Sequence, residues 1–181
     1  PKFRETRGTK FYKMYGMAIL CQQTRAVKYY PVEGYDTKSF LTTFEIHCAI
    51  HGVPSHVLSD PMSAFIAGAK VVGTGAVEEH PGEGSDFEDV LKRKYNIEWD
   101  FIPPGSQGRD PAERSIKSLK GMMQTIFNTE HNKSVLTINE YWSIFSQCAE
   151  ILNRRPIKGY MDDGTIKFIC PNQLLLGKTA K

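Results

Sequence analysis

The stretch that most constrains the fold covers residues 99–120, where a short apolar segment is followed by a turn and a helix. Residues 99–102 predict a short buried strand, which the next two prolines end because proline cannot donate to a strand ladder. A polar loop then leads to Asp110 and Pro111, which are typical of a helix N-cap and a first helical position. The sequence therefore predicts a strand, a loop and a helix over residues 111–127.

Two faces of this helix differ in chemistry. Its predicted apolar face contains Ile116, Leu119, Met123 and Ile126. Glu113, Lys117 and Lys120 stand at i, i+4 and i+7, so they share another face next to the loop. A carboxylate with two ammonium groups beside it suits a metal ion and a phosphate backbone. Glu113 also fits a capping box with Asp110, in which it only binds a backbone N–H, and the spacing alone leaves both roles open.

Length and composition predict one ordinary folded domain. The chain has 181 residues, of which 40% are hydrophobic and 24% charged, as in soluble globular proteins. The net charge of +3 permits nucleic acid as a partner without demanding it. The four cysteines form no Cys-x-x-Cys pair and are expected to be reduced core residues of an intracellular protein. No apolar run reaches membrane-spanning length, and a first residue other than Met leads us to expect a fragment of a longer protein.

The N-terminal part predicts strands. Residues 1–13 are basic and fit either a hairpin arm or a solvated face. Residues 15–21 form an almost continuous apolar run, as expected of a central strand buried on both faces. Residues 25–32 alternate in polarity and follow a short turn, so the two segments predict a hairpin.

The next segment predicts a helix and a strand. Asp36 or Thr37 is expected to cap a helix that ends at Gly52, and its apolar positions are Phe40, Leu41, Phe44, Cys48 and Ile50. Residues 53–59 predict a short buried strand. Asp60 follows this strand, at the edge where open α/β sheets place their ligand sites. Asp60 can equally cap the helix that comes next, and position alone leaves both roles open.

The C-terminal third predicts a helix, a loop and a short apolar turn. Thr137 and Glu140 form a capping-box pattern ahead of a helix whose apolar positions are Tyr141, Ile144, Phe145, Cys148 and Ile151. Arg154 and Arg155 follow this helix and are expected to lie against its last carbonyls rather than against phosphate. Residues 158–167 are expected to form a loop.

The order of these elements resembles the catalytic core of retroelement integrases, which have a ribonuclease H-like α/β fold with a mixed central sheet flanked by helices. The resemblance covers nearly the whole chain. Several local strings are more similar still to the Pao/BEL group of long-terminal-repeat retrotransposons: residues 24–27 (Thr-Arg-Ala-Val), 59–60 (Ser-Asp), 101–104 (Phe-Ile-Pro-Pro), 152–157 (Leu-Asn-Arg-Arg-Pro-Ile) and 171–177 (Pro-Asn-Gln-Leu-Leu-Leu-Gly).

The resemblance implies a DDE-type nucleotidyltransferase and endonuclease that uses two Mg²⁺ or Mn²⁺ ions for 3′-end processing and for strand transfer of element DNA into host DNA. Asp60 would be the second Asp of the metal-binding triad, and Glu113 its Glu. Carboxylate oxygens are the ligands that such hard cations prefer. The resemblance also implies four DNA-contacting residues: Ser106, Gln107, Lys117 and Lys120.

The chain departs from the family pattern in places. Family members have an Asp, two residues and then Gly-Pro, and Pro1 resembles that Pro, so the resemblance implies that the first Asp of the triad lies a few residues before Pro1. Asp36 is expected to belong to a helix cap and is rejected as this ligand. Without that ligand we expect the fragment to be inactive alone. Where relatives have a Gly-bearing turn, this chain has Met62, which can strain the turn or narrow the site. Two alternatives stay open: a catalytically degenerate module that binds DNA or protein, and an RNA-cleaving ribonuclease H.

The resemblance also suggests an organisation and partners. Residues 1–153 would form an N-terminally truncated catalytic core, and residues 154–181 its C-terminal extension. The expected partners are element ends and target DNA, with a homo-oligomer expected by analogy and neither a membrane nor a small-molecule cofactor. The expected location is intracellular, with the nucleus as the place of integration.

Overall fold

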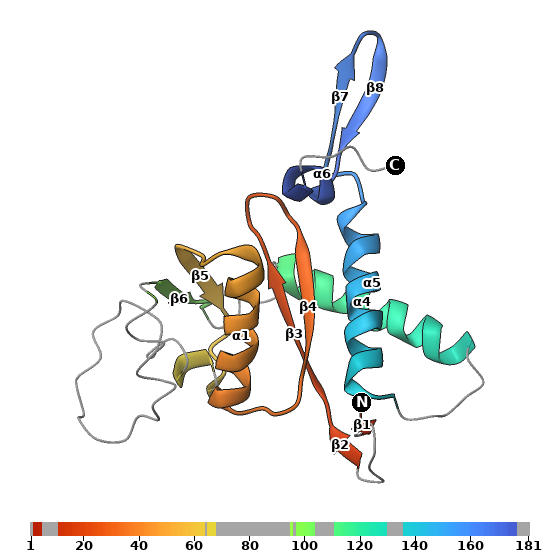
Figure 1. Cartoon of the computed structure of the whole chain (residues 1–181). Coiled ribbons are helices and arrows are strands. Elements are labelled where there is room, and N and C mark those ends of the chain that lie inside the picture. Colours follow the sequence, from red (N-terminus) through yellow and green to blue (C-terminus); the bar gives the residue numbers. More distant parts are fainter. Residues whose placement is uncertain are drawn as a thin grey trace. The chain divides into compact units, whose positions relative to one another are not determined.

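The computed structural model divides the chain into two compact units. The first consists of Pro1–Pro31 with Asp110–Lys181, and the second of Val32–Arg109. The helices and strands are labelled in Figure 1. Among the described residues, no helix is long and apolar enough to cross a membrane. The residues that the structure describes are 2–4, 11–63, 65–67, 95, 97–103, 111–129 and 136–176.

The basic N-terminal segment contains a pair of strands. β1 (Lys2–Arg4) pairs with β2 (Phe11–Lys13) in antiparallel orientation, with Phe3 opposite Tyr12. The sequence left open whether residues 1–13 form a hairpin arm or a solvated face, and the antiparallel pairing agrees with the hairpin arm.

The predicted hairpin that follows is confirmed. β3 (Tyr15–Leu20) pairs with β4 (Val27–Val32). The turn between them is closed by a 2.8 Å hydrogen bond from the Arg25 N–H to the Cys21 carbonyl. The expectation that β3 is buried on both faces is wrong, because Met17 is the one buried residue of this strand. In the described part of the chain, β3 pairs with no strand other than β4.

Two helices provide most of the core of the first unit. α4 (Pro111–Thr129) begins at Pro111 as predicted. α5 (Ile138–Asn153) begins at the predicted capping box, in which the Glu140 N–H donates to Thr137 Oγ1 over 3.3 Å and the Thr137 N–H donates to the Glu140 carboxylate over 2.6 Å. The buried residues of this core are Met14, Val27, Tyr29, Leu119, Tyr141, Phe145, Cys148, Ala149 and Leu152.

Phe145 lies at the centre of this core. The rings of Tyr29 and Tyr141 meet it edge-on, with centroids 6.3 and 6.2 Å away. A Cβ at Gly16 would lie 3.3 Å from the Phe145 ring, so the close approach of β3 favours glycine there. Ile151 was expected on the apolar face of α5, but 58% of it is exposed. It follows Phe145 by six residues, which is roughly 240° around the helix.

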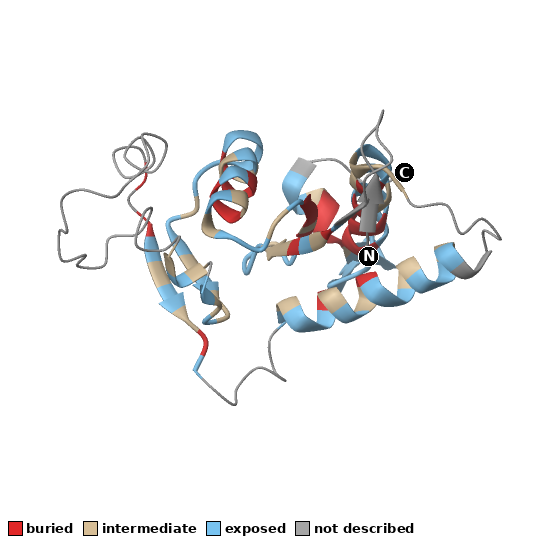
Figure 2. Cartoon of the chain, turned by 90° about the horizontal axis from the view of Figure 1, so that it is seen from below, coloured by how far each residue is buried: buried red, intermediate tan, exposed pale blue. Residues whose placement is uncertain are grey.

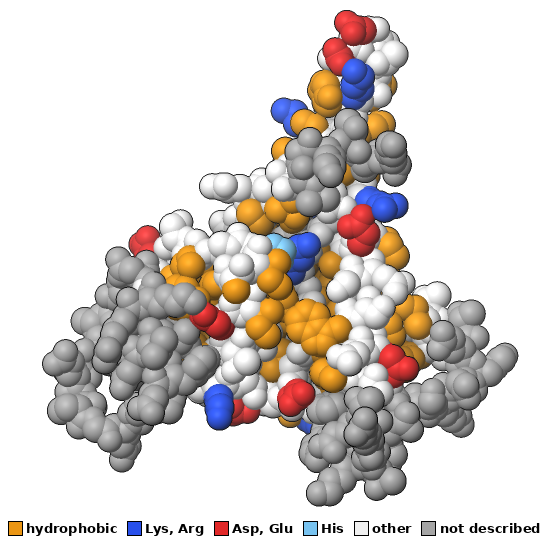
Figure 3. Space-filling view, viewed as in Figure 1, with side chains coloured by type: hydrophobic (Ala, Val, Ile, Leu, Met, Phe, Trp, Pro, Cys, Tyr) orange, Lys and Arg blue, Asp and Glu red, His pale blue; other side chains and the backbone are white. Residues whose placement is uncertain are grey.

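Residues 158–167, expected to be a loop, lie instead in a β-hairpin. β7 (Lys158–Asp162) and β8 (Thr165–Ile169) are antiparallel and stand beyond the end of α5 (Figure 1). Asp163 and Gly164 have φ values of 48° and 74°, as a type I′ turn requires. Figure 3 shows hydrophobic side chains on this hairpin, and its large exposed residues are Tyr160, Met161, Ile166 and Phe168.

A short helix, α6 (Pro171–Leu176), occupies the predicted apolar turn. Asn172 Nδ2 donates a 2.8 Å hydrogen bond to the Glu150 carboxylate, which also accepts one from Arg154 Nε at 2.9 Å. Together these bonds lower the pKa of Glu150, with the bond from Asn172 contributing most. The expectation that the Arg154 side chain lies against the last carbonyls of α5 is therefore wrong.

The second unit contains α1 (Thr37–His51), which begins and ends as predicted. Asp36 Oδ1 accepts a 3.0 Å hydrogen bond from the Ser39 N–H, and Gly52 ends the helix with a φ of 89°. The expected apolar position Ile50 is 63% exposed, so that part of the prediction is wrong.

Two parallel strands lie next to α1 within the same unit. They are β5 (His56–Ser59) and β6 (Glu98–Phe101). Both were expected to be buried, yet exposed and half-buried residues alternate along each (Figure 2), so one face of this pair packs on protein. The ring of Trp99 provides that packing, with its centroid 5.9 Å from that of Phe40 and 5.6 Å from that of Phe44.

The cysteines follow their prediction in part. Cys48, Cys148 and Cys170 are buried and are not part of a disulfide, as expected of reduced core residues. Cys21 is exposed in the turn between β3 and β4, so its assignment to the core is wrong.

Candidate functional site

The first turns of α4 present the predicted charged face. Glu113, Lys117 and Lys120 are all exposed, whereas Leu119 is buried in the core of the first unit and Met123 packs against that core. Figure 2 shows this division along the helix. Glu113 lies in the first turn, where the partial positive charge of a helix N-terminus favours a carboxylate. This face therefore presents one carboxylate and two ammonium groups to solvent.

The start of α4 is fixed to β4 by a buried hydrogen bond. The Tyr29 hydroxyl donates to the Ser115 carbonyl over 2.7 Å. Burial raises the pKa of Tyr29, so the hydroxyl keeps its proton and remains a donor at neutral pH. Ser115 stands two residues after Glu113, and this bond therefore restrains the turn that presents the Glu113 carboxylate.

The end of α5 is fixed to the same strand by Asn153, which sequence reasoning missed. Its Oδ1 accepts a 2.8 Å hydrogen bond from the Val27 N–H, and its Nδ2 donates a 2.9 Å bond to the Val27 carbonyl. Asn153 is 1% exposed. A signal was available, because Asn153 follows Phe145 and Ala149 at intervals of four along the buried stripe of the helix.

Asp60 directly follows β5 and is half-buried. The next helical hydrogen bond runs from the Ile66 N–H to the Met62 carbonyl over 2.9 Å, so Met62 takes the N-cap position. The interpretation of Asp60 as the cap of this helix is therefore wrong. Met62 has no positive φ, so the strain foreseen at this turn is not found either.

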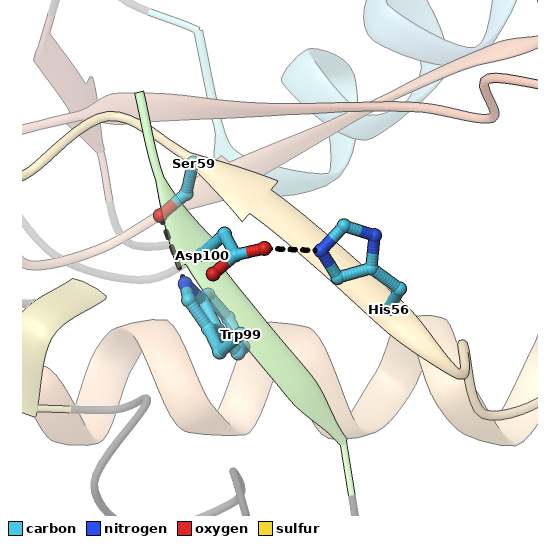
Figure 4. A network of polar contacts seen from close by, with 4 residues as sticks. All are labelled: His56, Ser59, Trp99 and Asp100. Atoms are coloured by element: carbon cyan, nitrogen blue, oxygen red, sulfur yellow. Dashed lines mark hydrogen bonds and ion pairs between the residues drawn. The ribbon is translucent and has the colours of Figure 1, made fainter. Parts of the chain in front are cut away.

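A small polar network holds the strand that leads to Asp60 (Figure 4). Trp99 Nε1 donates to Ser59 Oγ over 3.0 Å, and on the other face His56 Nε2 lies 2.9 Å from Asp100 Oδ2. Ser59 stands opposite Phe101 in the parallel register. Both strands therefore end at the same edge, the one where such sheets place ligands.

The predicted site residues are distributed over the two units. Asp60 belongs to the second unit and Glu113 to the first, and the structure describes each carboxylate within its own unit. Ser106 and Gln107 lie outside the described residues. No group of three His, Cys, Asp or Glu side chains that could hold a metal ion occurs among the residues described.

The donor set nevertheless has the chemistry that Mg²⁺ requires. Asp60 and Glu113 each offer carboxylate oxygens, and Glu113 is exposed while Asp60 is half-buried. A hard divalent cation prefers such oxygens and usually keeps several waters, for which a ligand open to solvent leaves room. Each of these carboxylates, taken by itself, therefore fits as a ligand of such a cation.

Comparison with known proteins identifies the fold. No protein-family model and no curated protein sequence matches this chain. A chain of the simian T-cell lymphotropic virus intasome, in complex with the PP2A regulatory subunit B56 gamma, is similar at 13% identity with a TM-score of 0.59. The alignment covers 97% of this chain and 51% of the viral chain, so the protein spans about half the length of that relative.

Two structures of the HTLV-2 integrase catalytic core domain in complex with magnesium are also similar. The dimeric form has 13% identity, a TM-score of 0.53 and coverage of 91% of this chain and 86% of the viral one. The trimeric form has 14% identity, a TM-score of 0.54 and coverage of 97% and 90%. The ribonuclease H-like fold of integrase catalytic cores, predicted from the sequence, is thereby confirmed.

Proposed function

We propose that this chain is the catalytic-core part of a retrotransposon integrase of the Pao/BEL type, which joins element DNA to host DNA by metal-dependent polynucleotidyl transfer. The main support is the start of α4, where Glu113, Lys117 and Lys120 are exposed in one row. The integrase-core fold supports the same reading. Residues 1–153 form the core in this proposal, and residues 154–181 extend it.

In this proposal Asp60 and Glu113 hold Mg²⁺ or Mn²⁺ together with a third carboxylate encoded upstream of Pro1. Ions held by these carboxylates would supply Lewis-acid activation of the attacking oxygen and stabilisation of the leaving 3′-oxygen. The HTLV-2 cores bound to magnesium support this choice of metal. Tyr29 holds the helix turn that presents Glu113, through its bond to the Ser115 carbonyl.

DNA is the proposed partner of the exposed face of α4. Lys117 and Lys120 would contact backbone phosphates, and the loop residues Ser106 and Gln107 would contact the DNA next to the cleaved bond. A homo-oligomer is proposed as the working form, which the dimeric and trimeric HTLV-2 cores support. The reaction would take place in the nucleus.

The proposal is tested by strand transfer with a longer protein that includes the residues encoded upstream of Pro1. The substrate is a labelled terminal-repeat oligonucleotide, supplied with Mg²⁺ or Mn²⁺. We expect activity in the wild type, its loss in Glu113→Gln and in Asp60→Asn, and full activity in Ser146→Ala, which changes an exposed residue of α5. DNA binding by Glu113→Gln should persist, which separates lost chemistry from lost folding.

Binding measurements test the DNA-contacting face separately. We expect Lys117→Gln and Lys120→Gln to weaken binding to duplexes of any sequence and to reduce the salt slope by about one each. Lys38→Gln, an exposed lysine of α1, is the control of equal charge. A longer wild type with neither activity nor metal binding would instead support the degenerate DNA- or protein-binding module.

A further inference from the structure

Three arginines from distant parts of the sequence meet at one pocket in the first unit. Arg25 comes from the turn between β3 and β4, Arg114 from the first turns of α4, and Arg155 from just beyond the end of α5. The pocket has a volume of about 100 Å³, and buried Val27, Ser115 and Leu152 belong to its lining. Figure 1 shows the three elements that contribute to it.

No described carboxylate neutralises the positive charge at this pocket. In the part of the chain that the structure describes, no carboxylate pairs with Arg25, Arg114 or Arg155. The adjacent Arg154, by contrast, forms an ion pair with Glu150 at 2.9 Å. Three guanidinium groups without a described carboxylate partner repel one another around this small pocket, and an anion among them would reduce that repulsion.

The backbone conformation of Arg25 is a further observation in favour of an anion site. Arg25 has a φ of 59°, a left-handed conformation that is uncommon for residues other than glycine. The turn imposes this conformation, since its N–H donates to the Cys21 carbonyl over 2.8 Å. Costly backbone conformations tend to occur where side chains must be aimed at a ligand.

The size and chemistry of the pocket fit a single phosphate group. Guanidinium forks match phosphate oxygens in bidentate geometry, and the N-terminal end of α4 adds partial positive charge. Clefts that enclose whole small molecules measure roughly 300–1,000 Å³, well above the pocket of about 100 Å³ found here. One phosphate of a larger molecule is therefore the better occupant.

We propose that Arg25, Arg114 and Arg155 form a second DNA contact, which binds one backbone phosphate on a different side of α4 from Glu113 and Lys117. At 100° per residue, Arg114 and Ser118 of the pocket point roughly 100° away from Glu113 and Lys117. This inference rests on the proposed function, because it takes the phosphate to be that of bound DNA.

The test compares Arg25→Gln, Arg114→Gln and Arg155→Gln with the matched control Arg154→Gln. Fluorescence anisotropy measures binding to a labelled duplex over a series of salt concentrations. We expect each pocket variant to bind the duplex about three- to ten-fold more weakly than the wild type. The slope of the logarithm of the binding constant against the logarithm of the salt concentration should fall by less than about one unit, and the affinity of the control should stay within about two-fold of the wild type. Unchanged thermal midpoints show that the variants are folded.

A second measurement follows the arginine Nε–H signals of the wild type by NMR during titration with inorganic phosphate. Shifts at the three pocket arginines, together with weaker DNA binding by their variants, support the proposal. Phosphate binding with unchanged DNA affinity would assign the pocket to free phosphate and overturn it. If the three pocket variants bind the duplex as tightly as Arg154→Gln does, and Lys117→Gln binds it weakly, this inference alone is overturned. Unchanged affinity in Lys117→Gln as well would contradict the proposed function too.

Discussion

The hydroxyl of Tyr29 donates a 2.7 Å hydrogen bond to the backbone carbonyl of Ser115, across 86 positions of the sequence. This bond joins β4 to the first turns of α4, two residues beyond Glu113. The same strand is held at Val27 by the Asn153 side chain at the end of α5. β4 therefore connects the start of one helix with the end of another, and the geometry of the charged face depends on it.

Tyr29→Phe should loosen the start of α4 without unfolding the protein. The ring keeps its edge-on contact with Phe145, but the hydrogen bond to Ser115 is lost, which we expect to cost about 1 kcal/mol in the free energy of unfolding. Hydrogen exchange in residues 111–119 should become faster. Tyr160→Phe, on the exposed hairpin, is the control and should leave both measurements unchanged. Unaltered exchange in Tyr29→Phe would show that the bond does not restrain the helix.

Stability should fall at high pH. Burial raises the pKa of both Tyr29 and Tyr141 above the ordinary value of 10.0. In the unfolded chain these tyrosines lose their protons first, so above about pH 10 the unfolded state binds fewer protons than the folded state. The stability that the two protonated tyrosines contribute is fully present below about pH 10. It is lost as the pH rises through their pKa values in the folded protein. Urea unfolding between about pH 9 and pH 11 should show the decrease, and Tyr29→Phe should make it smaller.

Asn153→Ala should destabilise the first unit more than any loss of an exposed side chain. It leaves the Val27 N–H and carbonyl without their partner in a buried setting, at a cost of about 2–4 kcal/mol in the free energy of unfolding. Asn139→Ala, in the exposed first turn of the same helix, should change it by less than about 0.5 kcal/mol. Equal effects of the two changes in urea unfolding would contradict the assigned role of Asn153.

Local signals explain why the helices were predictable. Each helix end is specified by residues within one or two turns of it, and the structure confirms these signals. They are Asp36 and Gly52 for α1, Pro111 for α4, and Thr137 with Glu140 for α5. The charged face of α4 follows from helical periodicity alone.

One error was local. The hairpin at residues 158–169 was missed although Asp163 and Gly164 are a strong turn signal and β8 alternates between polar and apolar residues from Thr165 to Phe168. Other features were missed because they depend on distant contacts. The contact of Asn153 with Val27 spans 126 positions, and the pocket collects Arg25, Arg114 and Arg155 from three segments. No local pattern specifies such pairings.

Ser59→Ala tests the network that precedes Asp60. The change removes the acceptor of the 3.0 Å hydrogen bond from Trp99 Nε1, so the half-buried indole N–H loses its partner. We expect a loss of about 1 kcal/mol in the free energy of unfolding. Ser55→Ala changes an exposed serine just before the same strand and should have no measurable effect. In a Trp142→Phe background, the emission of Trp99 should respond to Ser59→Ala and not to Ser55→Ala.

Cys21 should be the most reactive thiol of the folded protein. Burial acts to raise its pKa, but hydrogen bonds from the Thr24 side chain and from the backbone of Thr24 and Gln23 outweigh it and lower the pKa. Burial raises the pKa of Cys148, which lies in the core. Because the thiolate is the reactive form, N-ethylmaleimide at neutral pH should label Cys21 at least roughly ten-fold faster than the buried cysteines. Mass spectrometry over time should find one label on the native protein and almost none on Cys21→Ser. Labelling of Cys148 at a comparable rate would mean that the core opens far more often than its packing around Phe145 implies.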